Sequence, residues 1–401
     1  MSFPGLTSGR VLVIALSLLL TGAASASTIV LVQRSDDSSP KAKGIHGKGP
    51  LQAHPIAGNF KADDTELAGC RDQTCYEQAF GNIAYEDGPK RALALFDQKI
   101  ISDRPIEAGC HRIVHAIGSA SLARYDGNVA QAFAEGSSSC WSGYYHGILE
   151  RAFYGVTSKD RLGTVARGLC DDGEIRKTAW LAYQCVHGLG HGLMIHTGLN
   201  LPFSLQICDK LATGWDQSSC TGGVFMENIT PSAGTRSPWL KTNDLVYPCN
   251  SVKERHKQYC YLMVTSRILQ ANGYDWQDAA KTCSRVERGW LSTCFQSYGR
   301  DASGFTRQNP PRILKLCRTA GRGFSDCLFG AARDMTSNYA GGEQAAGLCD
   351  RAPKGLKSRC FFGIGTILGG LAPTSQGRRA ACTGITKRYV RPCLRGSGEP
   401  A

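Results

Sequence analysis

The residues with the clearest chemical potential are histidines, six of which lie between residues 111 and 196 of this 401-residue chain. Within that stretch, three pairs of possible metal ligands have members four residues apart: His111 and His115, His146 and Glu150, and His187 and His191. Residues at this spacing lie on one face of an α-helix. We therefore expect three helices that each present two groups able to bind the same ion, because neutral imidazole and carboxylate are both common ligands.

The cysteines place two of these histidines at equivalent positions. His146 follows Cys140 by six residues, and His191 follows Cys185 by six residues. In stacked helical units, equivalent positions face each other across a helix separation of about 8–10 Å. Later units carry other residue types at this position, so the histidines are a local feature and not part of the structural repeat. The register predicts that imidazoles from neighbouring helices converge.

These patterns predict an extracytoplasmic metal-binding protein, and more specifically a metalloenzyme. Five histidines and one glutamate exceed the needs of one structural zinc ion, and the surplus favours two ions, or one ion beside a general base. We assign Glu150 a catalytic role, and we expect His196 and Tyr183 to orient the ligands. The predicted ligands are His111, His115, His146, Glu150, His187 and His191.

The ligand types also bear on the metal and the reaction. A set rich in imidazole favours copper or iron, with zinc close behind. Such an ion could activate water for attack on an acyl or phosphoryl group, as in a hydrolase, or activate oxygen, as in an oxidoreductase. The sequence lacks the motifs of covalent haem attachment, of the zinc proteases, of the serine hydrolases and of phosphate-binding loops.

A non-catalytic scaffold is the alternative function. Histidines four residues apart can also be hydrogen-bonded core residues, and helical repeats commonly bind proteins or polymers along a concave face. The net charge is +13, and residues 301–401 hold 16 basic against 6 acidic residues. This distribution predicts an anionic envelope polymer or an acidic protein as partner. Nucleic acid is not expected, because aromatic residues are not interleaved with the basic ones.

Eighteen cysteines indicate the elements that position these residues. From Cys220 to Cys393, the second cysteine of each pair recurs at intervals of 33 to 40 residues. A period near 33 residues is that of a two-helix unit in a solenoid, as in tetratricopeptide repeats, although the consensus residues of that family are not found. We predict an all-α solenoid of helical hairpins, each stapled by a disulfide. The pairs expected from this spacing are Cys208–Cys220, Cys249–Cys260, Cys283–Cys294, Cys317–Cys327, Cys349–Cys360 and Cys382–Cys393. Spacing does not fix the connectivity within residues 70–185, where sequential pairing is taken by default: Cys70–Cys75, Cys110–Cys140 and Cys170–Cys185.

Glycine recurs in the same register, three residues after the second cysteine in six of eight units. Glycine inside a helix costs about 1 kcal/mol relative to alanine. A repeated glycine therefore predicts that the neighbouring helix approaches closely at that point.

Other residues of these types are interpreted without a site. Arg300–Asp301 and Arg333–Asp334 stand at nearly the same distance from their cysteines and predict surface ion pairs. Glu227 occupies the position of Asp301 in its own unit and could reach the histidines from the next repeat. The histidines expected to be solvated are His46, His54 and His256.

The chain begins with a targeting segment. Residues 11–33 carry no charge and follow Arg10, which predicts a signal peptide or an uncleaved membrane anchor within residues 1–34. Residues 35–66, rich in Ser, Pro, Gly and Lys, predict a flexible stalk. The folded body would comprise helical units with the histidines at 67–205 and helical repeats at 206–401. Either fate of the first segment places this body outside the cytoplasm, where disulfides form.

Overall fold

The computed structural model describes residues 58–137, 139–231, 236–339 and 341–400. These residues form twenty α-helices and four short 3-10 helices, and this part of the chain contains no strand. The all-α prediction is confirmed. The described residues belong to one compact unit, Gly49–Ala401. The predicted targeting segment at 1–34 and most of the predicted stalk lie outside them, and none of the helices described is both long and apolar enough for a membrane span.

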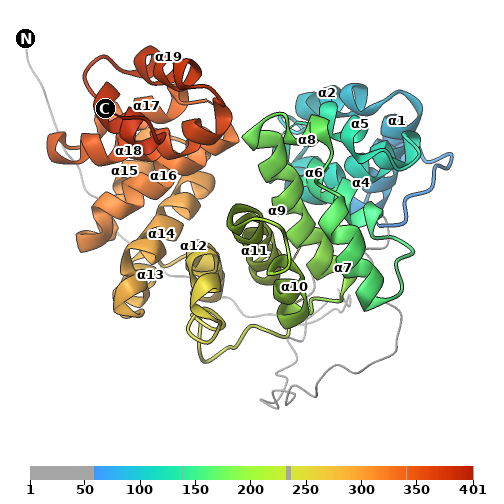
Figure 1. Cartoon of the computed structure of the whole chain (residues 1–401), viewed down its shortest axis with the longest axis horizontal. Coiled ribbons are helices and arrows are strands. Elements are labelled where there is room, and N and C mark those ends of the chain that lie inside the picture. The colour runs from blue at the N-terminus through green and yellow to red at the C-terminus, as the bar shows by residue number, and fades with distance from the viewer. Residues whose placement is uncertain (1–57, 138, 232–235, 340, 401) are drawn as a thin grey trace, which may run out of the picture. The chain divides into compact units, whose positions relative to one another are not determined.

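A row of mostly longer helices forms the main part of the fold, and each packs on the next one in the row (Figure 1). Their bounds are α1 (Gln73–Glu86), α4 (Cys110–Arg124), α6 (Ser139–Ala152), α9 (Ala179–His196), α11 (Gly214–Ile229), α12 (Glu254–Ala271), α14 (Leu291–Phe305), α16 (Phe324–Asn338), α18 (Lys357–Leu371) and α20 (Val390–Gly396).

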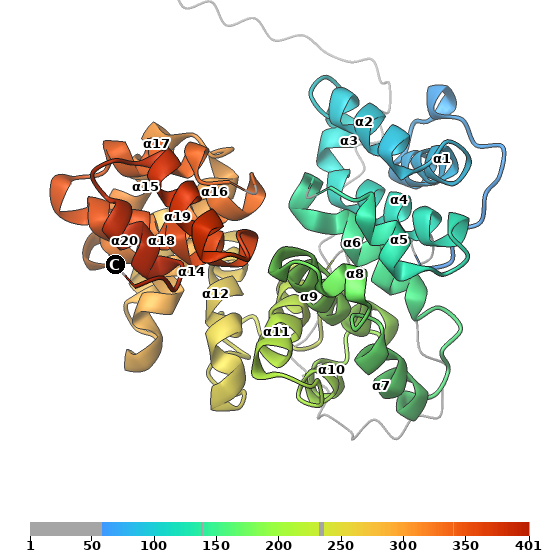
Figure 2. The same cartoon turned by 45° about the horizontal axis from the view of Figure 1, so that its top comes forward.

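Shorter helices connect the members of this row (Figure 2). Several begin with an explicit start signal: the Asn309 side chain accepts a hydrogen bond from the Arg312 amide, and Pro310 takes the first helical position. The alternation of short and long helices is compatible with the predicted repeat. The connecting helices are α2 (Pro89–Lys99), α3 (Arg104–Ala108), α5 (Val129–Ala134), α7 (Lys159–Gly168), α8 (Gly173–Arg176), α10 (Leu201–Cys208), α13 (Trp276–Cys283), α15 (Pro310–Thr319), α17 (Glu343–Arg351) and α19 (Ser375–Ile385), with 3-10 turns η1 (Leu67–Gly69), η2 (Arg288–Trp290), η3 (Gly321–Gly323) and η4 (Lys354–Leu356).

All eighteen cysteines form disulfides, and each bonds to its neighbour in the sequence. Most bridges staple a short helix to the next long one; Cys317 of α15 and Cys327 of α16 are an example. Cys110–Cys140 differs, because it joins the long helices α4 and α6 directly. Closing a loop of about 15 residues removes roughly 3 kcal/mol of unfolded-state entropy. Nine bridges indicate an oxidising, extracytoplasmic environment.

The predicted close approach of helices at the recurrent glycines is confirmed. A Cβ atom on Gly223 of α11 would overlap the His187 carbonyl oxygen of α9, and one on Gly330 of α16 would overlap the Gln296 carbonyl oxygen of α14. Gly147 of α6 lies in the same way against the His115 carbonyl oxygen of α4. The backbones of the histidine-bearing helices are therefore in direct contact, which brings their side chains within reach of one another.

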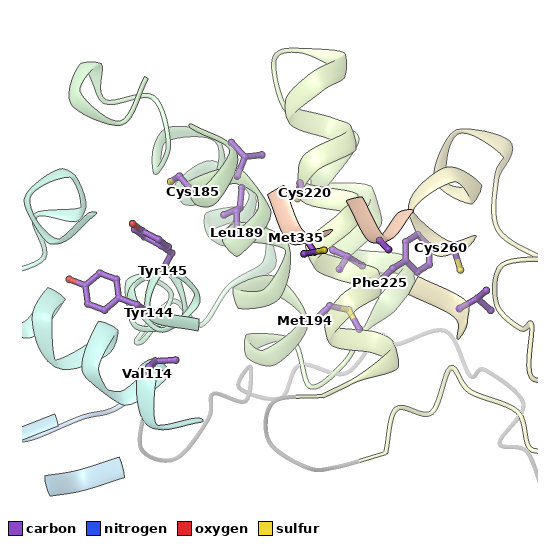
Figure 3. Packing of buried hydrophobic residues seen from close by; sticks show 14 of the residues in the cluster. Val114, Tyr144, Tyr145, Cys185, Leu189, Met194, Cys220, Phe225, Cys260 and Met335 are labelled. Carbon is purple, nitrogen blue, oxygen red and sulfur yellow. The ribbon is translucent and has the colours of Figure 1, made fainter. Parts of the chain in front are cut away.

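Apolar side chains fill the remaining space between the helices. Val114 of α4, Tyr144 of α6, Leu189 of α9 and Phe225 of α11 are all fully buried. They belong to one hydrophobic cluster that continues from helix to helix, as Figure 3 shows. The histidine-bearing helices are thus held on both sides by packed core, and their imidazoles occupy fixed positions.

Candidate metal centre

The five predicted histidine ligands come from three consecutive long helices. His111 and His115 lie on α4, His146 on α6, and His187 and His191 on α9. Four of these side chains are buried, and His111 is partly exposed. Buried polar groups are expected to have partners, so each ring nitrogen calls for an account of what it bonds.

The ring nitrogens converge on two adjoining places. His111, His115 and His146 each offer a nitrogen within 4.8 Å of the other two, and so do His146, His187 and His191. His146 belongs to both groups. Its ring stacks on that of His191, with centroids 3.9 Å apart and planes 14° apart. The expectation that equivalent positions of adjacent units face each other is met by this pair.

The hydrogen bonds of the first group fix where its lone pairs point. His111 Nδ1 lies 2.7 Å from the Cys140 carbonyl oxygen, which can only accept, so this nitrogen is the donor. His115 Nδ1 donates to the Glu150 carboxylate across 3.3 Å. The Nε2 atoms of His111 and His115 therefore carry lone pairs, and they lie 3.2 Å apart. Two facing acceptors repel, and a cation between them removes the repulsion; nitrogens on one tetrahedral zinc ion are about 3.4 Å apart.

The second group repeats this arrangement. His191 Nδ1 donates to the Glu227 carboxylate across 2.9 Å, and both side chains are buried. The Nε2 atom of His191 then carries a lone pair and has no hydrogen-bond partner among the described residues. Neither ring nitrogen of His146 has one. Carboxylates that hold the outer nitrogen of a histidine are typical of metal sites, because they fix the tautomer and the ring orientation.

Burial keeps these imidazoles neutral. It lowers the pKa of His187 to about 3, with the charges of His191 and Arg300 adding to the effect. Burial, followed by the charge of His115, lowers the pKa of His111 to about 4. The pKa values of His146 and His191 also lie well below the ordinary range, for the same first reason. Neutral imidazole is the form that binds a metal.

Glu150 does not lie among the converging ligand atoms of either histidine group. Its carboxylate bonds to His115, and it is not among the side chains whose ligand atoms converge. Glu227 stands in the same relation to His191, so the reach from the next repeat considered for it does occur. The two glutamates bond alike: each follows the histidine it bonds by 35 or 36 residues.

Of three other residues interpreted from the sequence, Tyr183 lies beside the centre, whereas His196 and His256 lie away from it. The Tyr183 hydroxyl lies 3.4 Å from His187 Nδ1, and the two rings stack. His196 bonds instead to the Val156 carbonyl oxygen, away from both groups. The expectation of a solvated His256 is wrong, because that side chain is buried and bonds to Asp209 across 2.8 Å. His46 and His54 lie outside the described residues.

The centre opens on a cavity of about 960 Å³, whose wall includes His111, His187 and His191. Arg300 and Asp301 of α14 line the same cavity and form an ion pair across 2.7 Å. Their side chains are 22% and 15% exposed, so the prediction of a surface pair is wrong here. Arg300 and Arg333 each follow the second cysteine of their unit by six residues, the spacing at which His146 and His191 stand. This shared spacing was the sequence signal that could have placed the arginines near the histidines.

Comparisons of the chain with protein-family models, with curated proteins and with solved structures found no match.

Proposed function

We propose that this protein binds one or two first-row transition-metal ions at the centre formed by His111, His115, His146, His187 and His191, and that it acts as an extracytoplasmic metalloenzyme. The observation that carries the proposal is a set of imidazole nitrogens on His146 and His191 that have no hydrogen-bond partner in the described part of the chain and are buried where two groups of histidines meet. An unpaired polar atom in the interior costs about 1–3 kcal/mol. A bound cation would remove that cost at several nitrogens together.

The donor set supports copper or iron first and zinc next. The converging atoms are all imidazole nitrogens, which suit these metals, whereas magnesium and calcium prefer oxygen. Such an ion supplies Lewis acidity to a water or a substrate oxygen, or redox chemistry with oxygen.

The chain's own residues would orient the metal ligands and control access to the centre. Glu150 and Glu227 fix the rings of His115 and His191 through their Nδ1 atoms. The packed helices exclude bulk water from the inner ring, His146, which is fully buried. Substrate can reach the centre from the cavity side, where His187 and His191 are in the wall. A centre that is closed on one side and open to a large cavity on the other is typical of catalytic and not of structural metal sites.

The test is elemental analysis of protein folded in an oxidising host. We expect at least one equivalent of a transition metal in the wild type, and at least one equivalent less in the double variant His187→Ala, His191→Ala. His196→Gln is the matched control, since this buried histidine lies on the same helix but outside both groups. It should keep the wild-type metal content.

Folded wild-type protein that stays metal-free after exposure to Cu²⁺, Fe²⁺ and Zn²⁺ would refute the proposal. Equal metal content in the double variant and the wild type would do so as well. The non-catalytic helical scaffold would then be the remaining function.

A further inference from the structure

The cavity beside the histidine centre has a strongly cationic wall. Its lining includes five arginines and only two aspartates: Arg112, Arg236, Arg267, Arg300, Arg333, Asp301 and Asp334. Arg112 pairs with Glu77, outside that lining, across 2.8 Å. Arg300 pairs with Asp301 and also contacts Ser266 and Met263. Among the described residues, no carboxylate forms an ion pair with Arg236, Arg267 or Arg333.

Arg333 of α16 is the clearest case. No carboxylate in the described part of the chain forms an ion pair with it, and its buried Nε atom has no hydrogen-bond partner there. Its guanidinium lies 5.7 Å from the centre of the Phe329 ring. The neighbouring Asp334 carboxylate instead accepts a hydrogen bond from the Asn338 side chain across 3.0 Å. A guanidinium that is partly buried without an anion calls for one, because its fork of donors matches an oxyanion.

Arg300 and Arg333 share this cavity with residues of the histidine centre. His187, His191 and Tyr183 line it together with the two arginines. The Tyr183 hydroxyl lies 3.4 Å from His187 Nδ1. One ligand in the cavity can therefore contact both the arginines and the centre.

The rest of the wall is apolar. Met226, Ile229, Leu240, Leu262 and Phe305 line the cavity together with the arginines. A volume of about 960 Å³ admits a small organic molecule with a sizeable apolar body.

We propose that the cavity binds an organic anion whose carboxylate or phosphoryl group is held by Arg333, with Arg300 beside it, and whose apolar body lies against the wall next to the histidine centre. This inference rests on the proposed function, since the anion would be the substrate of that centre. Arg300 and Arg333 are then substrate-binding residues.

Calorimetric titration of the metal-loaded full chain tests the inference. The probes are phenyl phosphate and hexanoate, with hexanol as the uncharged control. We expect at least one anion to bind and hexanol to bind more weakly, and the stronger anion identifies the head group. Arg333→Gln should weaken anion binding about 10- to 100-fold, because hydrogen bonds to charged groups are among the strong ones. Arg333→Lys keeps the positive charge but loses the forked pair of donors. Its affinity for the anion should lie between that of the wild type and that of Arg333→Gln.

Arg318→Gln is the matched control, an exposed arginine of α15 outside the cavity lining, and it should bind like the wild type. The inference is overturned if both anions bind no better than hexanol, or if Arg333→Gln binds as the wild type does. Metal content is measured on the same samples. Metal-loaded protein that ignores the anions overturns only this inference, whereas Arg333-dependent binding to protein that takes up no metal overturns only the proposed function.

Discussion

The α9/α11 and α12/α14 interfaces carry polar residues at the same register. At the first interface an imidazole nitrogen is left without a partner among the described residues, whereas at the second the polar groups bond to one another. In the first, Glu227 accepts from His191, and the far nitrogen of His191 is left without a partner among the described residues. In the second, Asp301 accepts from Thr265 and from Ser266 across 2.5 and 2.8 Å. Both carboxylates stand seven residues after a bridged cysteine, Cys220 or Cys294.

The difference separates a structural network from a ligand site. Ser297 completes the second network by bonding to Thr265 Oγ1 across 2.6 Å, so these hydroxyls satisfy one another. At the first interface, His191 bonds to Glu227 through Nδ1, and its Nε2 has no hydrogen-bond partner among the described residues. His191 converges there with His146 and His187. Each interface has a carboxylate at the same register, Glu227 or Asp301. The side chains of the preceding helix determine whether the polar groups satisfy one another or leave nitrogens available for a ligand. Substitutions at matched positions can break this contrast.

The largest effect is expected at His146. Because this ring belongs to both groups of converging nitrogens, His146→Ala should remove all stoichiometric metal. Ser266→Ala, at the same register position of the second interface, should leave metal content unchanged. Elemental analysis of the two purified variants measures the contrast, and a metal-loaded His146→Ala protein would contradict it.

The two carboxylates should differ next. Glu227→Gln removes the acceptor that holds His191, and loss of such a partner typically lowers metal affinity 10- to 100-fold. Asp301→Asn alters a network without metal and should leave the affinity as in the wild type. Competition titration with a chelator of known affinity gives both values. Equal affinity of all three proteins would mean that Glu227 has no role in holding the ligand.

The close contact between backbones gives a third test. Gly223→Ala places a methyl group against the His187 carbonyl oxygen, so α9 and α11 must move apart. We expect a loss of about 1–3 kcal/mol in the free energy of unfolding, together with weaker metal binding. Gly330→Ala meets the Gln296 carbonyl oxygen in the same way and should lose similar stability with metal binding intact. Denaturant unfolding and metal titration separate the two outcomes.

The smallest effect concerns pH. In metal-free protein, burial holds the pKa of His187 near 3, below the ordinary value of 6.5, so the unfolded chain takes up the proton first. Stability should therefore be complete above about pH 6.5 and fall below it, by about 1 kcal/mol per pH unit for each such histidine. His187→Gln should make this slope shallower, whereas Thr265→Ala should not. Unfolding curves between pH 7 and pH 5 that show identical slopes would exclude this role of burial.

Much of the fold follows from local patterns. Cysteine spacing predicted the helical hairpins and the bridges from Cys208 to Cys393, because each of these bridges spans a short segment between successive helices. The pairing within residues 70–185 did not follow from spacing. The recurrence of glycine predicted contact between backbones, which a Cβ on Gly223 would prevent. The spacing of His187 and His191 gave one helix face, and the shared register of His146 and His191 gave their mutual approach.

The remaining parts of the site depend on contacts between units far apart in the sequence. The sequence could not show that Glu150 bonds to His115 from the outside, because ligation and support require the same spacing. Nor could it place Arg300 and Arg333 in the wall beside His187, since α14 and α16 are several units away from α9. The predicted domain bounds, metal identity and partners stay predictions.

Diffraction from crystals of the metal-loaded protein, measured at the absorption edge of the bound metal, tests the central claim most directly. We predict an anomalous peak within bonding distance, about 2.0–2.2 Å, of at least three imidazole nitrogens of the five histidines. That peak should lie at His146, His187 and His191, alone or together with a second peak at His111, His115 and His146. A metal peak away from these histidines would contradict the account, with the nitrogens of His146 and His191 bonded to water or to other protein groups.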